Sequence, residues 1–247
     1  MTSNKSPDSV GIADIGAGAK ERGGEDLATE GKSWRSLIEA SSNRSRKIRG
    51  SNYVQIATVE PKTNQPRCRT VVFRGFLKLP EGHSCSNSCD DLSCIMKMIT
   101  DDRSQKVPQV MGHANQAAEL VWWFPKTSEQ YRVRGKLLFV GDGKFPLDSD
   151  RDLMIARKEQ WGNLSDAARE AFFDQKVPGE AYSGELSAVP IPQGGRDEEG
   201  KVLPPPHNFL LMLLIPNNVD YLRLTNQYRQ VDEQTGDGMW SSQRVNA

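Results

Sequence analysis

Two apolar stretches separated by only three residues constrain what this chain can fold into. The first, AELVWWFP, covers 118–125, and the second, EQYRVRGKLLFVG, covers 129–141. In the second, polar side chains alternate with Tyr131 and Val133, the period of a strand with one buried face. The link KTS is short, whereas parallel neighbours need a long crossover. The two stretches are therefore expected to pair as antiparallel strands.

Further strand-like segments lie on both sides of this pair. Three of them precede the pair: NYVQIATVEP, CRTVVFRGFLKLP and SCIMKMIT. Three more follow it: NFLLMLLIP, VDYLRLTN and MWSSQRVN. Most of them are joined by short turns rather than helices. This favours an antiparallel sheet, most simply closed into a barrel that removes its edges. We therefore predict an α+β fold that is mostly β, with a few peripheral helices.

Helical patterns and biased composition mark the remaining segments. Three helices are expected. Ser33 can cap the first, which begins WRSLI, and Ser165 can cap the third, DAAREAFF. The second is predicted from the apolar spacing in SDRDLMIARKEQWG. Residues 1–32 are rich in Gly, Ser and charge without an apolar period, so we expect a disordered tail followed by one domain over 33–247. Residues 178–207 hold six prolines and five glycines and predict a long loop.

Composition narrows the classes of partner and location. Lys plus Arg equals Asp plus Glu, giving zero formal net charge over 247 residues, so a broad nucleic-acid surface is not expected. The longest apolar run, FLLMLLIP, is far shorter than a bilayer requires. The N-terminus lacks a secretory pattern and is richer in acids than a transit peptide. We predict no membrane segment and a cytoplasmic protein with reduced thiols.

A cluster of cysteines, GHSCSNSCDDLSC at 82–94, raises the question of a metal site. Its cysteines are spaced C-x3-C-x4-C after His83, and the fourth cysteine, Cys68, stands alone on a predicted strand. Zinc sites usually place a second pair of ligands elsewhere in the chain, and no such pair is present. We therefore expect no metal here, although a thiol-based metal protein remains a third, weaker hypothesis.

Two segments beside strand ends concentrate groups that bind anions. In RTVVFRG, Arg69 and Arg74 are five residues apart and would face opposite sides of a regular strand. Both can address one ligand only if the strand twists, bulges or ends between them, which Gly75 makes plausible. In ITDDRSQK a strand runs into a predicted short helix, and Thr100, Ser104 and Lys106 lie around its start. Free N–H groups at a helix N-terminus favour phosphate.

Five motifs follow one another along the chain in this order: RTVVFRGF, ITDDRSQK, AELVWWFPKTSEQYRVRG, W…LSDAARE and NFLLMLLIPNNVDYLRL. Together they resemble the pyridoxamine 5′-phosphate oxidase superfamily, in particular its cyanobacterial, plant and algal FMN-binding branch, over 33–247. The resemblance implies an FMN-binding split β-barrel and a homodimer with FMN at the subunit interface. It also marks 80–93 as a loop insertion, because relatives usually join the flanking strands by a shorter link.

The resemblance also implies which residues contact FMN. Gln105 stands where the family has a basic residue, and Arg103 is a candidate replacement for that charge. Gln130 is expected near the flavin of the facing subunit. The full set of implied FMN-binding residues is Arg69, Thr70, Val71, Val72, Arg74, Thr100, Ser104, Gln105, Lys106 and Gln130.

The substrate side departs from the family pattern. The oxidases carry Y-F-x-x-R-P on a helix, whereas LMIARK here keeps Arg157 but has Leu153 in place of the tyrosine. The C-terminal R-L-H motif becomes LTNQYRQV, with Arg229 and no histidine. Arg157 and Arg229 are therefore the candidate substrate-binding residues, and no catalytic residue is assigned.

Two main hypotheses follow from the resemblance. The first is a dimeric, FMN-dependent oxidoreductase that converts pyridoxamine or pyridoxine 5′-phosphate to pyridoxal phosphate, with O₂ as oxidant and H₂O₂ as product. The second is a non-catalytic module that binds FMN or a B6 vitamer.

Overall fold

The computed structural model describes residues 29–182, 184 and 189–247. Most of the predicted tail therefore lies outside the described residues. The helices are α1 (Trp34–Ser45), α2 (Lys106–Met111), α3 (Arg151–Gly162) and α4 (Asp166–Phe173), with 3-10 turns at Pro146–Ser149 and Gln193–Gly195. Among the described helices, none has the length and apolar character that a bilayer crossing requires.

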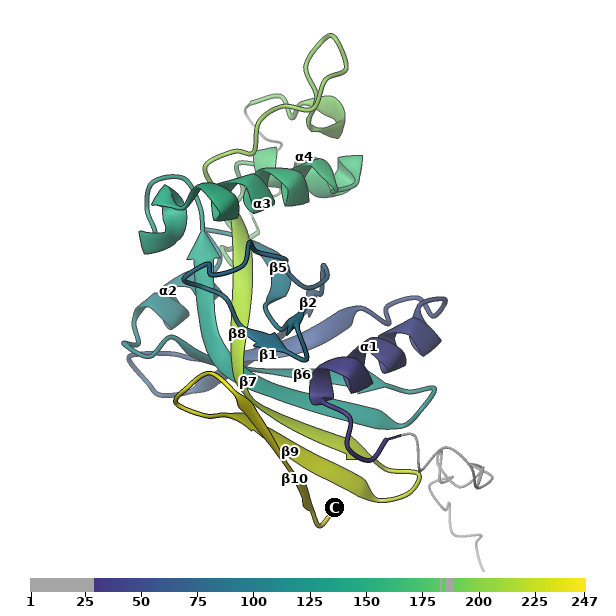
Figure 1. Cartoon of the computed structure of the whole chain (residues 1–247). Helices are drawn as coiled ribbons and strands as arrows, with labels where there is room; N and C mark the ends of the chain where they lie inside the picture. The colour runs from purple at the N-terminus through teal and green to yellow at the C-terminus, as the bar shows by residue number, and fades with distance from the viewer. Residues whose placement is uncertain (1–28, 183, 185–188) are drawn as a thin grey trace, which may run out of the picture.

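One antiparallel sheet dominates the molecule, in the order β10-β9-β8-β7-β6-β1-β2, and β5 pairs with β8. Figure 1 shows α3 and α4 stacked at one end of the long strands β7 and β8, away from β9 and β10. The prediction of a mostly β, antiparallel fold with few helices is confirmed. The strands are β1 (Tyr53–Val59), β2 (Pro66–Val72), β3 (Ser88–Cys89), β4 (Leu92–Ser93), β5 (Met96–Asp101), β6 (Ala117–Phe124), β7 (Glu129–Val140), β8 (Phe209–Arg223), β9 (Tyr228–Gln234) and β10 (Trp240–Val245).

The predicted hairpin at the centre of the chain forms as expected. β6 and β7 pair so that Trp123 lies opposite Gln130 and Phe124 opposite Glu129. Tyr131 and Val133 are fully buried, while the alternating polar residues Gln130, Arg132 and Arg134 face outward. The predicted N-caps of two helices also form, because the Ser33 and Ser165 side chains accept hydrogen bonds from the first turns of α1 and α4.

Three strand predictions are wrong. The segments NFLLMLLIP and VDYLRLTN form one strand, β8, which passes through Pro216 where the β7–β8 register shifts. A proline is tolerated at such an irregularity because no ladder N–H is needed there. β9 was not expected, because YRQVDEQ has few apolar residues. β2 ends at Val72, well before the predicted end of its segment.

β5 and β8 separate two packed regions. Alternate β8 residues, Leu210, Met212 and Leu214, belong to the main core on the α1 side, and Leu211 and Leu213 pack with α3. β5 alternates in the same way, with Met96 and Met98 in the main core and Ile99 near α4. The unbroken apolar run of β8 is explained by burial on both faces.

Gly135 of β7 is required by the close approach of β8 at the register shift. A Cβ at this position would overlap the carbonyl oxygen of Ile215. Backbone atoms cannot move aside cheaply, so Gly135→Ala is expected to lower the free energy of unfolding by roughly 2–3 kcal/mol, as overpacked cores do. Urea denaturation measures the effect. Gly236→Ala, which meets no atom within 4 Å, should stay near wild type, and equal stability of the two variants would contradict this account.

Candidate anion-binding site

A cradle of cationic and hydroxyl groups forms where β5 runs into α2. Lys106, the first residue of α2, donates from Nζ to Thr100 Oγ1 at 2.8 Å and to Ser104 Oγ at 2.6 Å. Thr100 is buried at the end of β5, and Ser104 lies in the turn between the two elements. The structure thus brings together three residues that the sequence placed in one anion site.

Arg69 of β2 joins the cradle through two residues that sequence reasoning missed. Its guanidinium donates to Thr58 Oγ1 at 2.7 Å and to Gln109 Oε1 at 2.6 Å. Thr58 lies on β1 and Gln109 on α2, and both are buried. Thr58 also donates to Gln109 Oε1 at 2.7 Å. These bonds fix Arg69 between two strands and the helix that carries Lys106.

The cradle is electrostatically prepared for an anion. Burial, followed by the positive charge of Arg69, lowers the pKa of Lys106 to about 8, although Asp101 opposes the shift. Burial also lowers the pKa of Arg69. Among the residues that the structure describes, neither cation forms an ion pair with a carboxylate within 4.0 Å. Two desolvated positive charges without a counter-charge are what a phosphate dianion would stabilise.

Acidic neighbours do not neutralise the cradle, because they are engaged elsewhere. Asp101 pairs with Arg103 at 2.6 Å and accepts from Asn208 at 2.8 Å. Arg103 also donates to the carbonyl of Asp174 at 2.8 Å. Arg103 was the candidate to replace the charge missing at Gln105. Its guanidinium is instead held by Asp101 and by the carbonyl of Asp174.

Arg74 carries a buried hydrogen-bond donor that is available to a ligand. β2 ends at Val72, between Arg69 and Arg74, and Gly75, directly after Arg74, has φ +98°. The Nε atom of Arg74 is buried and has no hydrogen-bond partner among the residues that the structure describes. A buried donor without a partner costs stability. Together with the uncompensated cradle, it fits a phosphorylated cofactor that carries further acceptors.

The remaining predicted cofactor residues lie outside the cradle. Thr70 and Val72 alternate with Arg69 and Val71 along β2 and therefore face the other side of the strand. Val71 packs against the main core. Gln105 is exposed before α2. Gln130 is half-buried on the outer face of β7, beside the exposed ring of Trp123. Their contacts with a flavin stay predictions.

Both candidate substrate-binding arginines are occupied. Arg157 is buried and donates to the carbonyls of Phe209 and Pro206, each at 3.0 Å. Arg229 binds both carboxylate oxygens of Asp220, at 3.1 and 2.8 Å. Neither side chain takes part in the cradle. A substrate role for either would require these contacts to break, and it stays a prediction.

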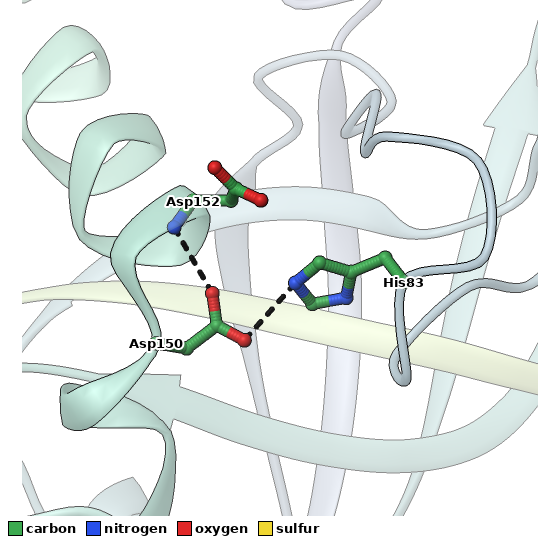
Figure 2. Close-up of side chains that lie close together, drawn as sticks. All are labelled: His83, Asp150 and Asp152. Carbon is green, nitrogen blue, oxygen red and sulfur yellow. Dashed lines mark hydrogen bonds and ion pairs between the residues drawn. The ribbon is translucent and has the colours of Figure 1, made fainter.

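The cysteine-rich insertion packs on the protein and forms the small β3–β4 hairpin. Cys89 and Cys94 are buried, Cys85 is half-buried, Cys68 is exposed on β2, and all four are free thiols. His83 and two aspartates, Asp150 and Asp152, form the group in the described part of the chain that could hold a metal (Figure 2).

The hydrogen bonds of His83 favour a clamp over a metal ligand. Its Nδ1 accepts from the backbone N–H of Cys85 at 3.1 Å, so in the neutral ring Nε2 carries the proton, toward Asp150 at 3.0 Å. A metal-bound histidine instead donates the N–H of its other ring nitrogen to a carboxylate, a backbone carbonyl or water. Asp150 in turn caps α3 by accepting from the N–H groups of Asp152 and Leu153. His83 therefore ties the insertion to the start of α3.

Comparisons with known proteins identify relatives of this chain. Residues 31–141 match the family described as pyridoxamine 5′-phosphate oxidase, FMN-binding domain. The matched segment contains β1, β2, β5, α2, β6 and β7, and hence all residues of the cradle.

Whole-length relatives agree with this match. A pyridoxamine 5′-phosphate oxidase-related, FMN-binding protein from Nostoc punctiforme is 33% identical, with a TM-score of 0.67, and the match covers 87% of this chain and 98% of that one. Pyridoxine/pyridoxamine 5′-phosphate oxidase 2 of Arabidopsis thaliana is 29% identical, over 89% of this chain and all of the relative. PhzG from Burkholderia lata, 15% identical with a TM-score of 0.56 over 86% of this chain and 92% of its own, shares the fold.

Proposed function

This chain belongs to the pyridoxamine 5′-phosphate oxidase-like, FMN-binding family and has its split β-barrel fold, and we propose that it binds FMN and acts as a flavin-dependent oxidoreductase. The proposed substrate is pyridoxamine or pyridoxine 5′-phosphate. The substrate proposal is supported by the Arabidopsis relative, whose name states this activity.

The observation that carries the FMN proposal is the convergence of Arg69 and Lys106, neither of which has a carboxylate partner among the described residues. Both cations are oriented by hydroxyl and amide groups rather than neutralised. The hydroxyls of Thr100 and Ser104 already accept from Lys106. The Thr100 hydroxyl donates to the Asp101 carbonyl at 3.4 Å, and the Ser104 hydroxyl can donate to an anion. We assign the FMN phosphate to this cradle and the buried Nε of Arg74 to a further acceptor of the same cofactor.

FMN, when bound, supplies hydride acceptance from the substrate and reoxidation by O₂ with release of H₂O₂. The contribution of this chain is to hold and orient the cofactor and to exclude water from the phosphate. Lys106 and Arg69 hold the phosphate charge. The buried wall formed by Thr58, Thr100 and Gln109 keeps both cations in place before the cofactor arrives.

We further propose a homodimer in which FMN lies between subunits. The outer face of the sheet near Gln130 carries the exposed aromatic rings of Tyr53 and Trp123, 49% and 40% accessible. Large exposed aromatics are enriched at protein interfaces. In this arrangement Gln130 of one subunit approaches the flavin held by the other.

A visible spectrum and an oxidase assay test the proposal. The purified full-length protein, with FMN added, should retain a flavin spectrum after gel filtration. With pyridoxamine or pyridoxine 5′-phosphate it should consume O₂ and release H₂O₂ in equal amounts. Failure to retain FMN would overturn both the cofactor and the oxidase assignments.

A second candidate function is a module that binds FMN or a B6 vitamer without turnover. The occupied donors of Arg157 and Arg229 favour it, because the two candidate substrate-binding residues are already satisfied by the protein. Retention of FMN without H₂O₂ release from either vitamer would select this alternative.

A further inference from the structure

Two buried thiols lie in and next to the cysteine-rich insertion. Cys89 and Cys94 are free thiols with 7% and 0% exposed surface, and both belong to the main core. Cys85, the third cysteine of this stretch, packs instead in the core region beside α3. Cys89 and Cys94 thus share one apolar environment that Cys85 does not enter, and neither is a member of the FMN cradle.

The β3–β4 hairpin sets the position of the two cysteines. Its turn residues, Asp90 and Asp91, have φ of +52° and +58°, left-handed as the two central residues of a type I′ turn must be. Across this turn the Cys94 N–H donates at 2.8 Å to the carbonyl of Asn87, two residues before Cys89. Residues opposite each other in an antiparallel ladder share a face, and so do residues two apart on a strand. Cys89 and Cys94 are therefore diagonal neighbours on one face of the hairpin.

The two thiols are hydrogen-bond partners and differ in acidity. Hydrogen bonding from Cys94, and to a smaller extent from Ser33, lowers the pKa of Cys89. This effect outweighs burial and the negative charges of Asp90 and Asp232. The same hydrogen bond, together with burial, raises the pKa of Cys94. Because the thiolate is the nucleophilic form of cysteine, Cys89 is suited to attack an oxidant while Cys94 stays a thiol beside it.

The hairpin that carries the pair is anchored on both of its strands. Asn87 donates from Nδ2 to the carbonyl of Pro216 at 2.9 Å, and the Arg35 guanidinium of α1 donates to the carbonyl of Ser93 at 2.8 Å. The turn residues 90 and 91 are exposed. The anchors keep the two sulfurs adjacent, and the exposed turn can take up the movement from hydrogen-bond contact to a covalent S–S bond of about 2.0 Å.

A buried acceptor lies on the same face of the hairpin as the pair. Asn87 stands opposite Cys94, and its Oδ1 atom is buried without a hydrogen-bond partner among the residues that the structure describes. A buried polar atom without a partner is uncommon in folded proteins. This oxygen can accept the O–H of a small hydroperoxide that approaches Cys89.

We propose that Cys89 and Cys94 form a peroxide-oxidisable pair, in which Cys89 is the reacting thiol and Cys94 the resolving thiol. The Cys89 sulfur first attacks one oxygen of a hydroperoxide, the O–O bond breaks, and the thiol proton leaves with the departing alcohol or water. Cys89 is then a sulfenic acid. The Cys94 sulfur next attacks the Cys89 sulfur, the S–O bond breaks, and the hydroxyl leaves as water with the Cys94 proton. Two thiols are oxidised to one disulfide, and the peroxide bond is reduced by two electrons.

Peptide mapping of the full chain after exposure to H₂O₂ tests this assignment. The chain has four free cysteines, and it should lose two thiols and gain one disulfide that dithiothreitol reduces. After alkylation in denaturant, cleavage at the aspartates of the turn separates the two cysteines, so linked peptides identify the Cys89–Cys94 bond. Cys68 and Cys85 should be recovered alkylated. The oxidant is added, so the result does not depend on FMN binding or on the proposed oxidase activity.

Two single variants test the separate roles of the thiols. In Cys94→Ala the sulfenic acid at Cys89 has no resolving partner and should be trapped by dimedone, whereas Cys89→Ala should give no adduct at Cys94. Cys85→Ala is the matched control and should form the disulfide as wild type does. Retention of all four thiols in the wild-type chain, a disulfide that includes Cys68 or Cys85, or equal trapping in the first two variants would overturn the proposal. The wild-type mapping decides it even if a variant fails to fold.

Discussion

Lys106→Met is expected to weaken FMN binding by about 10- to 100-fold, the range for loss of one hydrogen bond to a charged group. Among the described residues neither Lys106 nor Arg69 forms an ion pair with a carboxylate within 4.0 Å, so the phosphate would be the first anion in direct contact with Lys106. Methionine keeps the length and apolar stem of the side chain, so packing at the start of α2 should survive. Titration of FMN, followed by its fluorescence, measures the dissociation constant.

A matched variant guards this test against a general effect of losing a lysine. Lys158 is exposed on α3, and Lys158→Met should bind FMN as wild type does. Arg69→Ala should resemble Lys106→Met, because Arg69 shares the cradle. An unchanged dissociation constant in both cradle variants would show that the FMN phosphate binds elsewhere.

The same lysine predicts how FMN affinity depends on pH. In the free protein the pKa of Lys106 is about 8, and a bound phosphate must raise it, because the anion favours the charged ammonium. A ligand that binds the protonated form binds with full affinity below pH 8 and more weakly as the pH rises above it. Measurements from pH 7 upward avoid the titration of the phosphate itself, whose second pKa is near 6. Lys106→Met should lack this dependence.

The cradle was predictable in part because its charged members stand out in the sequence. Thr100 and Lys106 flank a strand-to-helix junction, and that pattern alone indicates an anion site. Thr58 and Gln109 were missed although a signal existed. Thr58 has the same parity as Val54 and Ile56 on β1, which places a hydroxyl on the buried face, and Gln109 is three residues after Lys106 on the same side of α2.

Other features depend on contacts between distant segments and could not be inferred locally. β9 is recognisable only from its neighbours, because its buried face carries Gln230 and Asp232, which bond to each other. The occupied state of Arg157 required knowing that the chain before β8 passes over α3. Local sequence records that an arginine is present, and tertiary packing decides whether its donors are free.

A buried carboxylate at the start of β7 anchors the β6–β7 hairpin to its neighbours. Glu129, at the start of β7, is fully buried and accepts hydrogen bonds from Ser41 and Thr127, each at 2.6 Å, and from Tyr221 at 2.8 Å. It also pairs with Arg223 at 2.9 Å and with Arg44 at 3.1 Å. The network therefore joins α1, β7 and β8 around one negative charge.

Glu129→Ala is expected to lower the free energy of unfolding by about 3–5 kcal/mol, because it leaves Arg223 buried without its partner. Chemical denaturation measures this loss. Glu30→Ala, which removes an exposed partner of the exposed Arg244, should cost less than about 1 kcal/mol. Similar losses in the two variants would contradict the central role of Glu129.

Acidification should reproduce part of the Glu129→Ala effect. Burial alone would raise the pKa of Glu129, but the hydrogen bonds from Ser41, Thr127 and Tyr221, with the charge of Arg44, outweigh it and lower that pKa below its ordinary value of 4.5. A carboxyl whose pKa is lower in the folded state stabilises the fold fully above 4.5, and this stabilisation is lost as the pH falls through the lower, folded-state pKa. The difference in unfolding free energy between wild type and Glu129→Gln should therefore be largest near neutral pH and shrink on acidification below pH 4.5. A difference independent of pH would mean that the carboxyl contributes through packing rather than through its charge.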